Sequence, residues 1–316
     1  MIKTDNNFML SEAKKARFKP NFFLQIIIFI GVVFVTMLIL GLIVDIPTTI
    51  WLISKTDFMN AAMEGDFQSA IGYASASPEW ILVLQLFATV VETTAAIIYC
   101  RFIEKRSLNS MGFIRQNAFK SYLKGYFVGA AMITASCLIA VITGNMSITV
   151  SASISVLSII IFFIGYLIQG MAEETLVRGY FMVSLTNSLH NRYAAAIAVF
   201  VSSLAFSILH IFNPGFTFLA FINLVLSGIF FGTYILRTDN IWSACAAHSS
   251  WNFFQGNVLG VRVSGLTMQS SIFSATEKGG SLISGGSFGL EGGLSVTIVE
   301  VIAILLVVFL PKKKAA

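Results

Sequence analysis

The sequence predicts an all-α fold: a polytopic membrane helical bundle of about eight transmembrane helices with both termini in the cytoplasm. Of the 316 residues, 56% are hydrophobic and 11% are charged, and the mean hydropathy is +0.84. Soluble globular domains carry roughly 25% charged residues. The charged residues of this chain are therefore too few to cover the surface of a water-soluble globule of this size. The composition also excludes a disordered chain and a disulfide scaffold.

Eight apolar segments approach the roughly 20 residues that a transmembrane helix needs. We expect helices at Phe22–Leu42, Trp80–Phe102, Tyr122–Thr143, Ser153–Gln169, Tyr193–Ile211, Phe216–Leu236, Ile241–Leu259 and Leu294–Leu310. A further apolar stretch, Gly179–Leu189, is expected to continue the fourth helix.

The positions of the basic residues predict the orientation. Lys and Arg gather in the N-terminal tail, in the connection Arg101–Lys124 and at Lys312–Lys314, whereas Gly144–Val150 and Asn213–Gly215 carry no charge. Cytoplasmic loops are the ones enriched in Lys and Arg. The net charge of +5 therefore fits orientation in a membrane, with lipid as the partner and no nucleic acid. We expect an integral membrane protein.

The chain divides into four expected regions. Residues 1–21 form a cytoplasmic N-terminal tail, 22–119 form N-terminal transmembrane helices with a cytoplasmic loop, 120–259 form a catalytic core, and 260–316 form a glycine-rich outer loop and the last helix. The segment Ser264–Gly293 is rich in Gly and Ser. We expect a flexible linker, and a closing flap or a short re-entrant turn is the alternative.

Ionisable residues within apolar segments suggest a functional site, because charge is costly in a bilayer. The candidates are Glu92, Glu173, Glu174, Arg178, His210 and His248. Cys100, Cys137 and Cys245 lie in apolar segments and are expected to be packing residues, not disulfide partners. For Glu92 the sequence leaves two options, a cavity wall or a polar partner within the bundle.

Glu174 and Arg178 are four residues apart, so they share a helix face and can pair. Glu173 lies about 100° around the helix and remains free, with the basicity that a general base needs. Glu173 and His210 are each about 18 residues from the turn near Arg192 and thus about 27 Å from it. In an antiparallel hairpin they would lie at the same depth, provided that Gly179 does not break the helix.

The third group of polar residues lies on the seventh expected helix. His248 and Asn252 are four residues apart and form a pair of hydrogen-bond donors on one face. Such donors can stabilise an oxyanion, while a carboxylate and a histidine can hold and deprotonate a water. Phe206 lies one turn from His210 on the same face. These parts suit hydrolysis at an acyl carbon without a Ser or Cys nucleophile.

Three motifs occur in order, Glu173-Glu174-x-x-x-Arg178, Phe206-x-x-x-His210 and His248-x-x-x-Asn252. This pattern resembles the CPBP family of intramembrane proteases, which includes the type II CAAX prenyl endopeptidases and the bacterial Abi proteins of bacteriocin processing and immunity. The stretch Ser284–Leu294 also looks like a glycine-rich C-terminal segment of some bacterial members.

The resemblance implies an intramembrane endopeptidase that acts on a hydrophobic or membrane-anchored peptide. It makes Glu173 the residue that activates water, His210 the residue that helps to hold this water, and His248 with Asn252 the oxyanion site. Glu174, Arg178 and Phe206 would be supporting residues. A metal-free mechanism is favoured, but Glu173, His210 and His248 could instead hold zinc with an open position for water.

Plainer interpretations remain open. The charged residues could be a helix end at the membrane interface, and the histidines could make hydrogen bonds between helices. The aromatic neighbours could be ordinary packing. Besides a protease, the sequence allows an immunity or binding protein on the same fold, or a transporter with Glu92 and Glu173 as proton sites.

Overall fold

The computed structural model describes residues 7–66, 68–69, 78–152 and 154–309. Five sequence expectations therefore fall partly outside the described residues. They are the first part of the N-terminal tail, residues 67 and 70–77 between the first two predicted helices, the starting residue Ser153 of the fourth helix, the final residue Leu310 of the last helix, and the basic run Lys312–Lys314.

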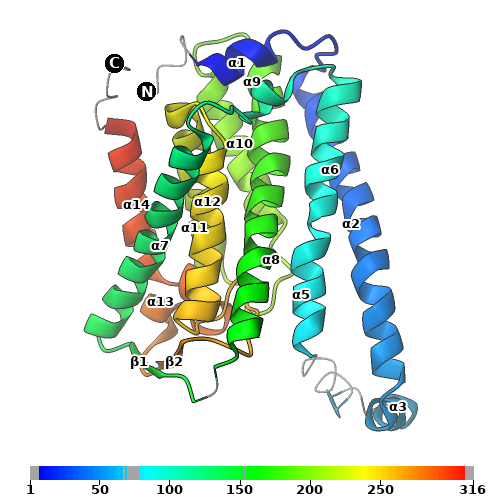
Figure 1. Ribbon diagram of the computed structural model, residues 1–316, viewed down its shortest axis with the longest axis vertical. Coiled ribbons are helices and arrows are strands. Elements are labelled where there is room, and N and C mark those ends of the chain that lie inside the picture. Colours follow the sequence, from blue (N-terminus) through cyan, green and yellow to red (C-terminus); the bar gives the residue numbers. More distant parts are fainter. Residues whose placement is uncertain (1–6, 67, 70–77, 153, 310–316) are drawn as a thin grey trace.

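The described chain is a helical bundle with one small sheet (Figure 1). Its N-terminal part contains α1 (Phe8–Ala13), α2 (Phe22–Ile53), α3 (Thr56–Met63), α5 (Glu79–Ala88), α6 (Val90–Ile98), η1 (Tyr99–Ile103) and η2 (Leu108–Met111). The central part contains α7 (Ala118–Ile142), β1 (Met146–Val150), α8 (Val156–Glu174), η3 (Thr175–Met182), α9 (Val183–Ser188), α10 (Ala194–Ile208), α11 (Phe218–Thr238), α12 (Trp242–Phe253) and η4 (Phe254–Val258). The C-terminal part contains β2 (Phe273–Glu277), α13 (Ser281–Ser284), η5 (Gly286–Phe288), η6 (Leu290–Gly292) and α14 (Leu294–Phe309).

Helices occur at all eight apolar segments, which confirms the membrane-embedded helical class. Among the described residues, five helical runs are long and apolar enough to cross a membrane: Phe22–Ile53, Glu79–Ile103, Ala118–Ile142, Val156–Ser188 and Phe218–Thr238. Two apolar helices, Ala194–Ile208 and Leu294–Phe309, are shorter. The count of eight transmembrane helices stays a prediction.

The first apolar helix is longer than the sequence predicts. It was expected to end at Leu42, but α2 continues to Ile53 with Pro47 inside it. Proline removes only one backbone donor, and the apolar run resumes directly after it, so helix is retained. The start of the connection between the first two predicted helices is therefore helical.

The sheet departs from the all-α expectation. β1 pairs antiparallel with β2, from Met146 opposite Glu277 to Val150 opposite Phe273. This pairing joins the uncharged connection between α7 and α8 to the glycine-rich segment. That segment is not an open linker, because Ser284, Phe288 and Leu290 within it are fully buried.

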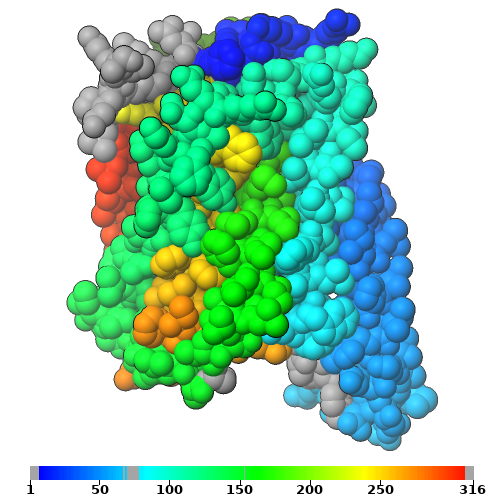
Figure 2. Space-filling view, in the orientation of Figure 1, coloured from blue at the N-terminus to red at the C-terminus, as the bar shows by residue number. Residues whose placement is uncertain are grey.

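The helix α12 lies at the centre of the bundle, packed against α7 and α8. Close approach depends on glycine: a Cβ at Gly129 of α7 would lie 1.9 Å from the carbonyl oxygen of Ala247, and one at Gly170 of α8 would lie 2.7 Å from the amide nitrogen of Ser249. On the face shown in Figure 2, α7, α8, α5 and α2 form most of the surface, and α12 reaches it only in patches between α7 and α8. The residues of α12 are therefore held inside the molecule.

Candidate active site

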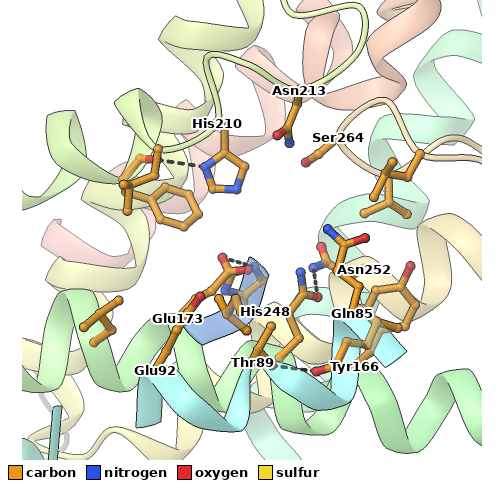
Figure 3. A pocket seen from close by; sticks show the side chains of 18 of the residues that line it. Gln85, Thr89, Glu92, Tyr166, Glu173, His210, Asn213, His248, Asn252 and Ser264 are labelled. Carbon is orange, nitrogen blue, oxygen red and sulfur yellow. Dashed lines mark hydrogen bonds and ion pairs between the residues drawn. The ribbon is translucent and has the colours of Figure 1, made fainter. Parts of the chain in front are cut away.

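A cavity of about 460 Å³ contains the predicted site. Glu173, Phe206, His210, His248 and Asn252 all line it. The helices α8, α10 and α12, far apart in the sequence, thus bring the three motifs to one place (Figure 3).

Glu174 and Arg178 form a buried ion pair directly behind the cavity wall. Both side chains are fully buried, and Arg178 Nη1 lies 3.0 Å from Glu174 Oε1. The same oxygen contacts Nδ1 of His248 at 2.9 Å. The Arg178 guanidinium also lies 4.3 Å from the centre of the Phe206 ring, a cation–π contact. One carboxylate therefore joins the first motif to the third, and the arginine reaches the second.

The helix changes its pitch immediately after these glutamates. The run Thr175–Met182 is a π-helix between α8 and α9, and such turns are frequent at functional sites. Gly179 lies within this run and does not break the helix, as the hairpin prediction requires. Arg106 Nη2 donates to the carbonyl oxygens of Gly179 (3.2 Å) and Tyr180 (3.3 Å), which fixes the π-helical run against the loop that precedes η2.

Glu173 points away from the ion pair, as its position on the helix predicts. Its side chain is 16% exposed, and its Oε2 lies 3.7 Å from Nε2 of His248. That oxygen has no hydrogen-bond partner among the described residues. An ionised carboxylate only accepts, so His248 Nδ1 must donate to Glu174, which leaves Nε2 as an acceptor in the neutral ring. A free carboxylate oxygen and a free imidazole nitrogen thus face each other.

His210 lies in the turn just after α10, which ends at Ile208, and is oriented by the last turn of that helix. Its Nδ1 lies 2.8 Å from the carbonyl oxygen of Phe206. A carbonyl only accepts, so Nδ1 donates and Nε2 is left for the cavity. The Phe206 ring lies 4.7 Å from the His210 ring and 6.0 Å from the His248 ring, centre to centre. Phe206 is therefore a spacer between the two histidines.

Asn252 points into the cavity with part of its amide already bound. Its Nδ2 donates to Oε1 of Gln169 at 3.0 Å, so the second N–H of the Asn252 amide is left for a ligand. Glu92 lines the same cavity, which decides between the two options that the sequence left for it.

Other polar residues of the cavity were not found from the sequence. They are Thr36, Asp45, Gln85, Thr89, Tyr166, Gln169, Asn213, Ser227, Ser264 and Glu291. Neutral side chains carry no signal against an apolar background, so only the two acids, Asp45 and Glu291, could have been found. The glycine-rich segment contributes part of the cavity wall.

The residues named for zinc do not form a ligand set in this geometry. Within the described part of the chain, no group of three or more His, Cys, Asp or Glu side chains could hold a metal ion. Glu173 and His248 face each other, but His210 does not join them as a third ligand. We derive no step through zinc.

The apolar helices define an integral membrane protein, and a polar site is buried among them. A model of the family described as "Type II CAAX prenyl endopeptidase Rce1-like" matches residues 155–254, the stretch that carries all three motifs. Over this stretch the chain is similar to the CAAX protease (CPBP) family, the resemblance that the motifs predicted. No curated protein and no solved structure matches it.

Proposed function

We propose that the protein is an intramembrane endopeptidase that hydrolyses a peptide bond in a membrane-associated peptide or protein, with Glu173 as the base that activates water. One observation carries the proposal: Glu174 is bound by Arg178 and His248, whereas Glu173 lines the cavity and its Oε2 has no partner among the described residues. Two adjacent carboxylates thereby have different environments, which is how acid–base sites assign different roles to like groups.

The attacking water belongs between Glu173 and His248. Their facing atoms are 3.7 Å apart, too far for a direct hydrogen bond and suited to a bridging water. From the sequence we expected His210 to help to hold this water, but the short distance between Glu173 Oε2 and His248 Nε2 favours His248. Glu173 Oε2 takes one proton as the water oxygen bonds to the carbonyl carbon. Glu173 then returns this proton to the leaving amine nitrogen as the C–N bond breaks.

The developing oxyanion needs donors on the other side of the carbonyl. The second N–H of Asn252 is available for this role, since the first is bound to Gln169. His210, with Nδ1 fixed on Phe206, presents Nε2 to the cavity and donates from it when protonated. Its fixed ring orientation means that no reorganisation is needed during the reaction.

The substrate is expected to be hydrophobic or membrane-anchored. Apolar side chains of α2, including Val33, Met37 and Leu40, line the cavity opposite the motifs. The name of the matched family refers to prenylated C-terminal segments, and a prenyl group has the same apolar character as this wall. We expect the protein to act in a bacterial plasma membrane.

The test compares membrane peptides from cells that carry the wild type with those from cells that carry Glu173→Gln. We expect at least one uncleaved membrane peptide to accumulate only with Glu173→Gln. The matched control is Glu277→Gln, a change of the same kind on the exposed strand β2. Identical peptide profiles for a folded and inserted Glu173→Gln protein would overturn the proposal.

Two other functions give different outcomes with the same variant. A bacteriocin self-immunity or binding protein would keep its protective effect in Glu173→Gln. A proton-coupled transporter is favoured only by the presence of both Glu92 and Glu173 in one cavity. Proton-dependent uptake by the purified protein in liposomes would support it over the protease.

A further inference from the structure

A tight two-residue turn forms part of the wall of the cavity. Val263 and Leu266 exchange two backbone hydrogen bonds of 2.9 Å, and φ is +47° at Ser264 and +88° at Gly265 between them. Positive φ at both central residues is the pattern of a type I′ turn. Val263, Ser264 and Leu266 all line the cavity, and Figure 3 shows Ser264 on the side of the cavity where His210 and Asn213 lie.

Serine is an unfavourable residue for the first central position. Type I′ turns prefer Asn, Asp or Gly there. Glycine has no Cβ, and Asn and Asp tolerate positive φ because their short polar side chains form local hydrogen bonds, whereas other residues are strained. Strained residues persist where the surroundings hold them, and they cluster at ligand-binding sites. The hydroxyl of Ser264 is therefore a feature that folding of the turn does not explain.

Glu291 holds this serine in place. Its Oε2 accepts from Ser264 N at 2.6 Å, from Ser264 Oγ at 3.2 Å and from Gln255 Nε2 at 3.2 Å. Glu291 is only 6% exposed, and burial of a carboxylate is costly unless hydrogen bonds compensate it. Two of its three hydrogen bonds go to one residue of one turn.

The turn is also wedged against the loop that carries Asn213. A Cβ at Gly265 would lie 2.0 Å from the carbonyl oxygen of Pro214, so only glycine allows this approach. Gly265 N donates to the carbonyl oxygen of Phe288 at 2.8 Å. The turn thus has a fixed position next to the end of α10, where His210 lies.

We propose that Ser264 binds the main chain of the peptide substrate through its hydroxyl oxygen, and that Glu291 is the residue that positions it. Because the hydroxyl donates its hydrogen to Glu291, the oxygen lone pairs are left to accept an N–H from an extended peptide in the cavity. The inference rests on the proposed function. Both residues lie outside the matched segment 155–254, so the recognition of substrate would use a part of the chain that the family match does not cover.

The first experiment is Ser264→Gly, with Ser281→Gly as the matched control. Glycine suits the left-handed conformation and keeps the N–H that binds Glu291, so only the hydroxyl and the strain are removed. On the peptide that accumulates with Glu173→Gln, we expect KM to rise about tenfold, the value of one hydrogen bond, with kcat and Tm not lowered. Ser281 is exposed on α13, and its variant should leave KM unchanged. An unchanged KM in Ser264→Gly would overturn the role of Ser264.

A double-mutant cycle tests Glu291 as a positioning residue. We expect Glu291→Gln to raise KM, and the double variant with Ser264→Gly to be no worse than Ser264→Gly alone, because both changes affect one contact. A merely structural Glu291 would give additive effects and would lower kcat and Tm as well. Additive effects would therefore overturn the positioning role.

A capture experiment separates this inference from the proposed function. A cysteine at position 264 in the Glu173→Gln protein would carry a short photoreactive maleimide, and captured peptides would be identified by mass spectrometry. Capture of the same peptides that accumulate supports both proposals. Accumulation without capture would overturn the role of Ser264 alone, and capture of membrane peptides without accumulation would overturn the hydrolysis alone. If no peptide accumulates and none is captured, both proposals are overturned.

Discussion

At the scale of single residues, the site depends on how few charges lie inside an apolar bundle. Glu174 and Arg178 are both fully buried and pair with each other, and His248 shares the carboxylate. Arg178 Nε and Nη2 have no hydrogen-bond partner among the described residues, but the Phe206 ring lies against the guanidinium. The pair neutralises two charges that would otherwise be left in hydrocarbon.

We expect Arg178→Met to destabilise the protein by about 3–5 kcal/mol, because removal of one partner leaves the buried Glu174 charge uncompensated. Unfolding of the purified protein in detergent measures this loss. The double variant Glu174→Gln/Arg178→Met should be more stable than Arg178→Met alone, since it leaves no charge unpaired. If Arg178→Met were as stable as wild type, the ion pair would not hold the motif together.

Glu291 makes stability depend on pH. Burial raises the pKa of this carboxyl to about 7 from an ordinary value of 4.5, against the opposing effect of its hydrogen bonds to Ser264 and Gln255. The folded chain then binds the proton more tightly than the unfolded chain. The stability that this group contributes is complete below pH 4.5 and is lost as pH rises to about 7, by on the order of 3 kcal/mol.

We therefore expect the Tm to fall between about pH 5 and 7, and this part of the fall to be absent in Glu291→Gln. Thermal unfolding of both proteins across this range is the measurement. Equal pH dependence in the two proteins would show that Glu291 is not the group that titrates.

Sequence reasoning found one part of the site and missed another, for a physical reason. Spacing within one helix is fixed, so the pairing of Glu174 with Arg178 and the exposure of Glu173 could be predicted. Contacts between distant segments are not fixed by spacing, so the bond from His248 to Glu174 and the turn at Ser264 could not be predicted. The family resemblance implied that His210 holds the water, and this role stays a prediction, whereas we propose His248, whose Nε2 lies 3.7 Å from Glu173 Oε2.

At the scale of the elements, the hairpin of α8 to α9 with α10 sets the depth of the site. The prediction required helix from the fourth segment to about Leu189, and the structure has a continuous helical run, Val156–Ser188. The π-helical turns within it could not be predicted, because they depend on contacts such as those from Arg106. Glu173 and His210 line the same cavity, as the equal distances from the turn suggested.

The pair Glu173→Cys and His210→Cys should be joined by a short bifunctional thiol reagent in membranes. A protease site engineered into the α9–α10 connection allows the chain to be cut there. The cross-link is then measured as a band shift, because joined fragments stay together after the cut. The matched control pairs Glu173→Cys with a cysteine at His190, which lies in the turn between α9 and α10, and should not be joined. A cross-link in the control alone would mean that the two helices do not align as described.

At the scale of the whole molecule, the site draws on more of the chain than the expected catalytic core. The division at residues 120–259 stays a prediction, but the cavity also contains Glu92 of α6, the apolar face of α2, and Glu291 near the C-terminus. The apolar segments could be predicted because hydropathy is a local property. The β1–β2 pairing and the packed glycine-rich segment could not be predicted, since both depend on contacts between segments that are far apart in the sequence.

Contacts join distant segments at each end of the bundle. At one end, Asp239 after α11 accepts from the amide of Met9 in α1, and Asn187 of α9 donates to the carbonyl oxygen of Ala13. At the other end, the β1–β2 sheet joins the α7–α8 connection to the segment after α12 (Figure 1). Eight crossings, with the α1 end in the cytoplasm, stay a prediction.

Labelling of single cysteines with a membrane-impermeant maleimide tests this topology. In a background without the three buried native cysteines, Thr149→Cys on β1 should be labelled in intact cells. Ser11→Cys on α1 should be labelled only after the cells are opened. Both positions are exposed, so differences report the side of the membrane. Ser274→Cys lies opposite Thr149 in the sheet and serves as the control that must match it.

Labelling of position 11 in intact cells and of position 149 only in opened cells would reverse the orientation, because the basic residues would then lie outside. Labelling of both in intact cells would contradict the crossing count, since α1 and the sheet would lie on one side of the membrane.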